Sequence, residues 1–326
     1  MIDLIGAPYD LSGPMLGSRI GPWAMRLLGF AQALRDLGLT VNDLGDAFPL
    51  SNEVPSRLAK RYAEGISACK ALRKSVSTSL KKGNLPVVMG GDHSLAMGTV
   101  AGALDVYGDD LAVVWIDAHM DLNTPDTTPS GNMHGMPLAA LALLEPGMHY
   151  GRAEKWSNAL TEAWSEILAD VVPRPGLRKS NVAWIGLRDV DEGEVRNQEG
   201  MPGSLVLTMQ DIDRLTAPGA IKALADWTAS TGAKKLWISF DVDALDPIFA
   251  PGTGTAVRGG LTYREGHLLA ETLHEMGFGE NAPFQIVGVD LVEVNPLHDN
   301  KGETARVAIE WASSLFGKTI MHTKAV

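Results

Sequence analysis

Short apolar runs, rich in β-branched residues and bounded by Gly, Asp or Pro, recur along this 326-residue chain. Between them lie segments of helical period, and this alternation is typical of a parallel sheet covered by helices. Runs without polar alternation indicate strands that are buried on both faces. The sequence therefore predicts eight strands, which are Ile2–Gly6, Thr40–Leu44, Leu85–Met89, Leu111–Ile116, Val182–Ile185, Leu205–Thr208, Leu236–Phe240 and Gln285–Val289.

Apolar side chains at helical spacing mark the connections between these strands. The two clearest sets are Trp23, Leu27, Phe30/Ala31 and Leu34 near the start, and Ile221, Leu224 and Trp227 later on. We expect a single α/β domain over residues 1–326. A doubly wound open sheet and a closed (β/α)₈ barrel both fit eight such units, and chain length does not separate them.

Segments that contain aspartate, and in two cases histidine, follow three of the predicted strands. Gly90-Gly91-Asp92-His93 follows Leu85–Met89, Asp117-Ala118-His119-Met120-Asp121 follows Leu111–Ile116, and Asp241-Val242-Asp243 follows Leu236–Phe240. Ligands bind at the carboxyl ends of strands in parallel α/β sheets. We therefore expect the three clusters to converge at one rim.

The spacing within these clusters also matters, because residues i, i+2 and i+4 of an extended backbone point the same way. Asp117, His119 and Asp121 should share one face, and Asp241 and Asp243 another. Such groups would repel one another unless cations neutralised them, so two divalent ions are expected. An isolated Asp-x-Asp is more often a helix cap or a turn, but the conjunction of three clusters favours a metal site. The expected ligands are His93, Asp117, His119, Asp121, Asp241 and Asp243.

This ligand set contains four Asp and two His and no Cys, which suits Mn²⁺, although Zn²⁺, Co²⁺ or Fe²⁺ could also bind. A hydroxide that bridges two such ions is a strong nucleophile near neutral pH. The sequence therefore predicts a two-metal hydrolase.

Composition narrows the partners and the compartment. The formal net charge of −11 disfavours nucleic acid and anionic lipid. The single cysteine, Cys69, cannot form an internal disulfide, which fits a reducing compartment. The chain shows neither a signal-peptide pattern nor an apolar run of roughly 18 residues, the length needed to span a bilayer. A cytoplasmic protein without nucleic-acid or membrane partners is expected.

The predicted site residues and the segments around them resemble those of a known family, the ureohydrolases, and specifically its bacterial arginase branch. The strongest matching motifs are Gly90–Leu95, Asp117–Pro125, Ser130–Gly135, Ser239–Pro247 and Glu293–Pro296. The start Ile5–Pro8 and the tail Asn300–Leu315 also match, so the resemblance covers nearly the whole chain. The resemblance implies an open sheet of eight parallel strands flanked by helices on both faces. It also implies a homo-oligomer, either a trimer or a hexamer.

By the same resemblance, one Mn²⁺ would be held by His93, Asp117, Asp121 and Asp241, and the other by Asp117, His119, Asp241 and Asp243. His134 would be the proton shuttle, and Glu293 the carboxylate that faces the substrate guanidinium. Together with the ligand Asp121 they form the expected catalytic set. Thr255 would support Glu293 by hydrogen bonding.

The loop from Asn123 to His134 carries the arginase-like pattern Asn-Thr-Pro-x-Thr-Thr-x-Ser-Gly-Asn-x-His-Gly. The resemblance implies that its side chains bind the α-carboxylate of L-arginine, while Asp191, helped by Glu194, meets the α-ammonium. The expected reaction converts L-arginine and water to L-ornithine and urea. The expected carboxylate-binding residues are Asn123, Thr128, Ser130 and Asn132.

Two other functions stay open. The chain could be a sister guanidino-hydrolase that acts on agmatine or guanidinobutyrate, or a metal-binding regulator without turnover. The presence of His134 and Glu293 beside all six ligands argues against the regulator, since binding alone needs neither. Arg258 departs from the family pattern, and a solvated surface arginine is its simpler interpretation, with contact to a neighbouring subunit as the alternative.

Overall fold

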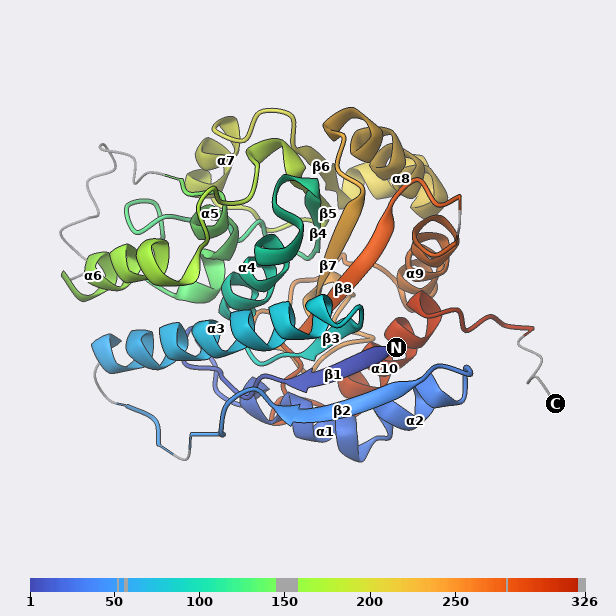
Figure 1. Ribbon diagram of the computed structural model, residues 1–326, viewed down its shortest axis with the longest axis horizontal. Helices are drawn as coiled ribbons and strands as arrows, with labels where there is room; N and C mark the ends of the chain where they lie inside the picture. Colours follow the sequence, from blue (N-terminus) through green and yellow to red (C-terminus); the bar gives the residue numbers. More distant parts are fainter. Residues whose placement is uncertain (52, 56–57, 145–157, 280, 322–326) are drawn as a thin grey trace.

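A computed structural model describes residues 1–51, 53–55, 58–144, 158–279 and 281–321. It contains an eight-stranded sheet with the strand order β2-β1-β3-β8-β7-β4-β5-β6, in which every pairing is parallel. Because β2 and β6 are unpaired edges, the sheet is open and is not a barrel (Figure 1). The strands are β1 Ile2–Gly6, β2 Val41–Asp46, β3 Leu85–Met89, β4 Leu111–Ile116, β5 Val182–Leu187, β6 Leu205–Thr208, β7 Lys235–Asp241 and β8 Gln285–Val292.

Ten α-helices lie among the described residues. They are α1 Gly21–Leu27, α2 Phe30–Arg35, α3 Leu58–Lys81, α4 Ala96–Tyr107, α5 Pro137–Leu141, α6 Asn158–Glu166, α7 Glu192–Glu199, α8 Met209–Thr231, α9 Tyr263–Gly277 and α10 Glu303–Leu315. In the part of the chain that the structure describes, none of these helices has both the length and the apolar character that crossing a bilayer requires.

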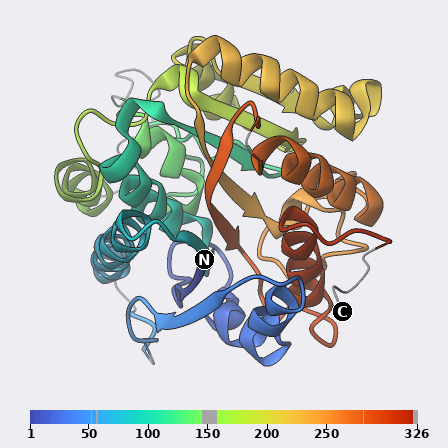
Figure 2. The same ribbon diagram turned by 45° about the vertical axis from the view of Figure 1, so that its right-hand side comes forward.

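Two apolar layers, one on each face of the sheet, form the core. Along β4, Ala112, Val114 and Ile116 belong to one layer, and Val113 and Trp115 belong to the other. Figure 2 shows α3 and α4 on one side of the sheet and α8, α9 and α10 on the other. Burial on both faces explains why these strands lack polar alternation in the sequence.

The eight strands lie where the sequence predicts them, with differences at some ends. The predicted bounds of β1, β3, β4 and β6 are confirmed. At the carboxyl end, β2, β5, β7 and β8 run beyond their predicted limits, to Asp46, Leu187, Asp241 and Val292. Pairing with neighbouring strands extends them past the apolar runs, as the register Asp241 to Val292 shows. At the amino end, β2 begins one residue later and β7 one residue earlier than predicted.

The first predicted helical segment is two short helices. Gly29 adopts a left-handed conformation with φ of 85°, which separates α1 from α2. Phe30 and Leu34 on α2 are fully buried, whereas Trp23 and Leu27 on α1 are 63% and 68% exposed. The apolar period therefore does not continue through the break, because each short helix orients separately.

Candidate metal centre

Five neighbouring strands of the sheet deliver the predicted site. His93 follows β3, Glu293 follows β8, Asp241 ends β7, Asp117 follows β4 and Asp191 lies beyond β5. These strands are adjacent in the order β3-β8-β7-β4-β5. Residues separated by up to 200 positions therefore meet at one rim, because all the strands are parallel and all their carboxyl ends face the same way.

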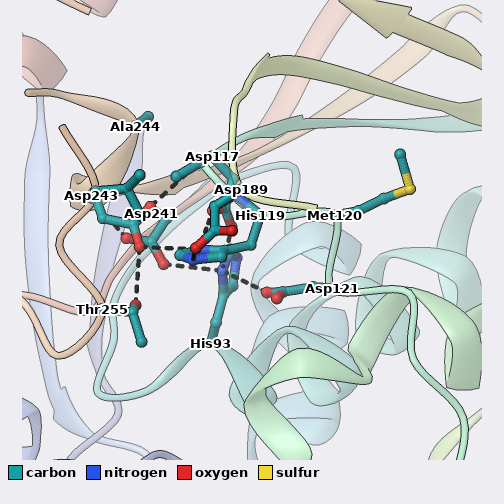
Figure 3. Close-up of polar contacts among 12 residues, drawn as sticks. His93, Asp117, His119, Met120, Asp121, Asp189, Asp241, Asp243, Ala244 and Thr255 are labelled. Atoms are coloured by element: carbon teal, nitrogen blue, oxygen red, sulfur yellow. Dashed lines mark hydrogen bonds and ion pairs between the residues drawn. The ribbon is translucent and has the colours of Figure 1, made fainter. Parts of the chain in front are cut away.

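The predicted convergence is observed, but turns produce it rather than extended backbone. The polypeptide leaves β4 at Ile116 through bends, and Asp121 has a left-handed φ of 51°. After β7 the chain forms a short 3-10 turn over Val242–Ala244, in which the backbone N–H of Asp243 donates to Oδ1 of Asp241 at 2.8 Å. Met120 and Val242, the residues between predicted ligands, are buried in the core, and Figure 3 shows Met120 pointing away from the cluster.

Within the cluster, His93 faces three carboxylates (Figure 3). Its Nδ1 lies 3.0 Å from Oδ2 of Asp117, 3.2 Å from Oδ2 of Asp121 and 3.2 Å from Oδ2 of Asp241. The other ring nitrogen, Nε2, lies 2.9 Å from the hydroxyl of Ser239. This second contact orients the ring so that Nδ1 points into the cluster.

His119 faces two carboxylates of the same cluster. Its Nδ1 lies 3.3 Å from Oδ1 of Asp117 and 3.2 Å from Oδ2 of Asp243. Asp117 thus turns one carboxylate oxygen toward His93 and the other toward His119. The hydroxyl of Thr255 donates to Oδ2 of Asp243 at 2.9 Å, so its partner here is Asp243 and not the expected Glu293.

Burial and mutual repulsion perturb the carboxyl groups of the cluster. Burial raises the pKa of Asp121 to about 6 and raises the pKa of Asp241 well above its usual value, and the neighbouring Asp117 adds to both shifts. Burial alone would lower the pKa of His93, but the facing carboxylates outweigh it and raise that pKa well above its usual value. Without cations, this site must hold extra protons to reduce its negative charge.

The donor atoms fit metal ions in two overlapping groups. One group is His93, Asp117 and Asp241, and the other is Asp117, His119 and Asp243, with the atoms of each group within 4.8 Å of one another. Among the described residues, neither Nδ1 of His93 nor Oδ2 of Asp117 has a hydrogen-bond partner, although both are buried. Cations would satisfy these atoms, and the mixture of carboxylate and imidazole suits Mn²⁺ or a similar divalent ion.

His134 and Glu293 lie together beside the cluster. Oε1 of Glu293 lies 3.2 Å from Nδ1 of His134, and it accepts a hydrogen bond from the backbone N–H of His93 at 2.9 Å. Glu293 has a left-handed φ of 62°, a conformation that costs energy for a non-glycine residue and is common at functional sites. Burial lowers the pKa of His134, but the hydrogen bond to Glu293 outweighs it and raises that pKa to about 9.

A cavity of about 240 Å³ opens next to these residues. Asn123 and Asp191 are joined within it, because Nδ2 of Asn123 donates to Oδ2 of Asp191 at 2.8 Å. Asp191 also begins α7 in a capping box, in which its Oδ1 accepts from the backbone N–H of Glu194 at 3.0 Å. Of the predicted site residues, those that line the cavity are His119, Asp121, Asn123, Thr128, Ser130, His134, Asp191, Glu194, Asp241 and Thr255.

Two predicted substrate contacts, Glu293 and Asn132, are not among the residues that line this cavity. Asn132 lies in the same loop, where its backbone N–H donates to the hydroxyl of Ser130 at 3.2 Å. Glu194 lines the cavity, but Oε1 accepts from the backbone N–H of Leu122 and Oε2 from that of Asp191. The carboxylate of Glu194 therefore connects the backbone at Leu122 to the start of α7 at Asp191. Arg258 is exposed, as expected for a solvated surface arginine.

The sequence analysis did not predict the structural roles of several residues at the site. Trp115, the fifth residue of β4, stacks on the His93 ring with centroids 3.9 Å apart. Asp189 lines the cavity, 3.8 Å from Nε2 of His119. Gly91 is packed so closely that an added Cβ would lie 1.7 Å from the carbonyl oxygen of Tyr9. Ser239 could have been suggested by its place on the same strand as Asp241, since a hydroxyl within a buried apolar strand requires a partner.

Comparison with known proteins gives the family. The model of the family described as "Arginase family" matches residues 1–317. The chain belongs to the arginase family. It is 37% identical to an arginase of Staphylococcus aureus over 325 residues, covering 98% of each chain.

Solved structures of the arginase family have the same fold. An arginase of Bacillus caldovelox has a TM-score of 0.81 and 37% identity, covering 98% of this chain and 99% of the other. An arginase of Entamoeba histolytica, solved in complex with L-ornithine, has a TM-score of 0.78 and 28% identity, covering 97% and 98%. The predicted family, open α/β fold and enzyme class are thereby confirmed, and the chain is a hydrolase of guanidino compounds from a metal-dependent family.

Proposed function

We propose that this chain is a dinuclear manganese hydrolase that converts L-arginine and water to L-ornithine and urea. The observation that carries the proposal is the cavity itself. Its lining combines members of the buried carboxylate and histidine cluster, His119, Asp121 and Asp241, with the hydrogen-bonded pair of Asn123 and Asp191. A cationic guanidinium suits the acidic cluster, and an amino acid head group suits the paired amide and carboxylate.

One Mn²⁺ would be held by His93, Asp117, Asp121 and Asp241, and the other by Asp117, His119, Asp241 and Asp243. When bound, the two ions lower the pKa of water and stabilise the negative charge that develops during hydrolysis. Asp117 supports this assignment, since its two oxygens face the two histidines. The hydroxyl of Thr255, which donates to Asp243, helps to orient that ligand.

Glu293 and His134 would act on the substrate guanidinium, with His134 lining the cavity and Glu293 in contact with His134 at 3.2 Å. The carboxylate of Glu293 can accept hydrogen bonds from the planar guanidinium, while its contact with His134 keeps that imidazole protonated near neutral pH. His134 lines the cavity and can therefore donate its proton to the departing amine.

Other residues that line the cavity would select L-arginine. Thr128 and Ser130 line it with hydroxyl groups and Asn123 with an amide, which can bind a carboxylate without a counter-charge. Asn132 would act on the same carboxylate from its place beside Ser130, although it does not line the cavity. Asp191 would pair with the α-ammonium, and the L-ornithine bound to the Entamoeba histolytica arginase supports an amino acid product.

The competing function within this proposal is hydrolysis of agmatine or guanidinobutyrate, which lack one of the two head-group charges. The deciding experiment measures urea release by the Mn²⁺-loaded chain from L-arginine, agmatine and guanidinobutyrate, together with metal analysis of the same sample. We expect about two Mn²⁺ per chain and a clear preference for L-arginine. Hydrolysis of agmatine alone would overturn the substrate assignment.

The assembly and the compartment are part of the proposal. We propose a cytoplasmic homo-oligomer, either a trimer or a hexamer, in accordance with the family resemblance. The apolar side chains of Ile248 and Leu297, which are 79% and 67% exposed, provide surface that self-association could bury. Light scattering coupled to gel filtration measures the mass, and a monomer at micromolar concentration would contradict this expectation.

A further inference from the structure

Arg188, which follows β5, makes an unusual set of contacts for an arginine. Its half-buried guanidinium makes six hydrogen-bond contacts, of 2.5 to 3.3 Å, with backbone carbonyl oxygens, and because three of them involve Nη2, one N–H is shared between two acceptors. Among the described residues, no carboxylate forms an ion pair with it. The accepting carbonyls belong to Gly186, Asp243, Ala244, Leu245 and Val257.

These contacts join two of the three segments that carry candidate metal ligands, those that follow β4 and β7. The guanidinium binds the carbonyls of three consecutive residues, Asp243 to Leu245, just after β7. The backbone N–H of Arg188 donates to the carbonyl of Ala118 at 2.9 Å, between Asp117 and His119. Ala118 closes the connection, because its own N–H donates to Oδ1 of Asp243 at 3.2 Å. One residue thus holds the β4 and β7 loops in register.

A third loop is tied in through Val257. Its carbonyl accepts from Nη2 of Arg188 at 2.8 Å, and Thr255 in the same loop donates to Oδ2 of Asp243. Gly260 makes room for the guanidinium, since an added Cβ there would lie 2.6 Å from Nη2. The packing is therefore built around this side chain.

The chemistry of arginine explains why this side chain can bind several carbonyl oxygens where these loops meet. Its planar group offers five N–H donors in a rigid fork and remains charged when partly buried. A cation bound to carbonyl oxygens stabilises the acidic loops without occupying a carboxylate oxygen that a metal ion would need. Lysine carries the same charge, but its compact ammonium group cannot reproduce the fork.

We propose that Arg188 is a positioning residue that sets the half of the metal centre formed by His119 and Asp243. The proposal rests on the dinuclear site described under the proposed function. Arg188 contacts the Asp243 loop directly and the His119 loop through Ala118, whereas His93 and Asp121 lie outside its contacts. Loss of the fork should therefore weaken one ion more than the other.

The test compares Arg188→Lys and Arg188→Gln with the wild-type chain in a Mn²⁺ titration followed by electron paramagnetic resonance. We expect the affinity of one Mn²⁺ per chain to fall by about 10- to 100-fold in both variants, while the other ion is retained. The spectrum should change from that of a coupled pair to that of a single ion, and excess Mn²⁺ should restore it. The matched control is Arg26→Lys, since Arg26 is also half-buried but pairs with Asp43 and Asp46 near the sheet edge.

A second measurement does not require metal. Hydrogen–deuterium exchange of the metal-free protein should accelerate in peptides that cover residues 117–122 and 242–246, with little change elsewhere. Unchanged affinities and exchange in the variants would overturn the proposal. Full rescue by Lys would also overturn it, because charge alone would then suffice, as would equal loss of both ions with a general loss of stability.

Failure of the proposed function has a different signature. A wild-type chain that binds two Mn²⁺ but releases no urea contradicts the reaction and leaves the Arg188 comparison intact. A wild-type chain that binds fewer than two Mn²⁺ overturns both proposals.

Discussion

Nδ1 of His134 lies 3.2 Å from Oε1 of Glu293, and the same carboxylate oxygen accepts the backbone N–H of His93. Glu293 thus links the proposed proton donor to the backbone of a proposed metal ligand. Its left-handed backbone, with φ of 62°, is stabilised by the N–H of Glu293, which donates to the carbonyl of Gly91 at 2.8 Å. Proton donation by His134 and metal binding by His93 are therefore assigned to different side chains, and substitutions can test them separately.

Replacing His134 with Asn should slow turnover while leaving the metals in place. The imidazole lies outside the two candidate metal groups, and general acid catalysis contributes typically 10²- to 10⁴-fold. We therefore expect kcat to fall by about 10²-fold or more, with Mn²⁺ content unchanged. Steady-state kinetics and metal analysis measure the two quantities. His274→Asn, on α9 and hydrogen-bonded to the carbonyl of Leu315, is the control, and an unchanged rate for His134→Asn would remove it from the mechanism.

Replacing Asp241 with Ala should release metal. In the proposed assignment this carboxylate serves both ions, so its loss removes one ligand from each. We expect the Mn²⁺ retained after gel filtration to fall to a minor fraction and urea release to be nearly abolished. Asp226→Ala is the control, since Asp226 is exposed and pairs with Lys222 on α8. Full metal content in Asp241→Ala would contradict the bridging role.

Asp191→Asn separates substrate binding from helix capping. Asn caps a helix about as well as Asp, so α7 should keep its stability, but the negative charge proposed to face the α-ammonium is lost. A charge-assisted hydrogen bond contributes about 1.5–3 kcal/mol, so KM for L-arginine should rise by roughly 10- to 100-fold. Asp211→Asn, at the N3 position of the α8 capping box, controls for the loss of a carboxylate at a helix start. An unchanged KM would exclude Asp191 from ammonium binding.

The stability contributed by Asp3 should depend on pH. Burial raises the pKa of Asp3, but hydrogen bonds from Ser79, Asn84 and Asn42 outweigh it, so the folded-state pKa lies below the usual 3.8. A depressed carboxyl pKa stabilises the fold at pH values above 3.8, and this contribution disappears as pH falls through the folded-state pKa.

Ser79→Ala tests this linkage, because the Ser79 hydroxyl donates to Oδ2 of Asp3 at 2.7 Å. Urea unfolding should show a loss of about 1.5–3 kcal/mol at pH 7 and a smaller loss below pH 3.8. Ser77→Ala is the control on the same helix, since its hydroxyl donates only to the carbonyl of Lys74. A loss that grows toward low pH would refute the assigned direction.

Cys69 should be unreactive in the folded protein. Its side chain is buried, and burial raises the pKa of the thiol to about 12, so very little thiolate forms at neutral pH. We expect Ellman's reagent at pH 8 to label the native chain only at the rate of unfolding. Because the chain has a single cysteine, denatured protein should bind one label per chain. Rapid labelling of the native protein would show that Cys69 is accessible.

Much of the site is present in the sequence because its elements are local. Buried strands appear as apolar runs, and the polar residues that end them must lie at the carboxyl rim. Sequence patterns alone therefore suffice to group Asp117, His119, Asp121 and Asp241. The motif resemblance then supplied His134, Glu293 and the substrate loop.

Tertiary structure decided the contacts that join segments distant in the sequence. The strand order places β8 between β3 and β7, which brings Glu293 next to His93, and no local pattern encodes that order. The packing of separate loops also decides three further features. These are the turns that orient the ligands, the hydrogen-bond partner of Thr255 and the carbonyl contacts of Arg188. Apolar periodicity and strand-end chemistry are properties of short segments, whereas hydrogen-bond partners are chosen only when the whole sheet has assembled.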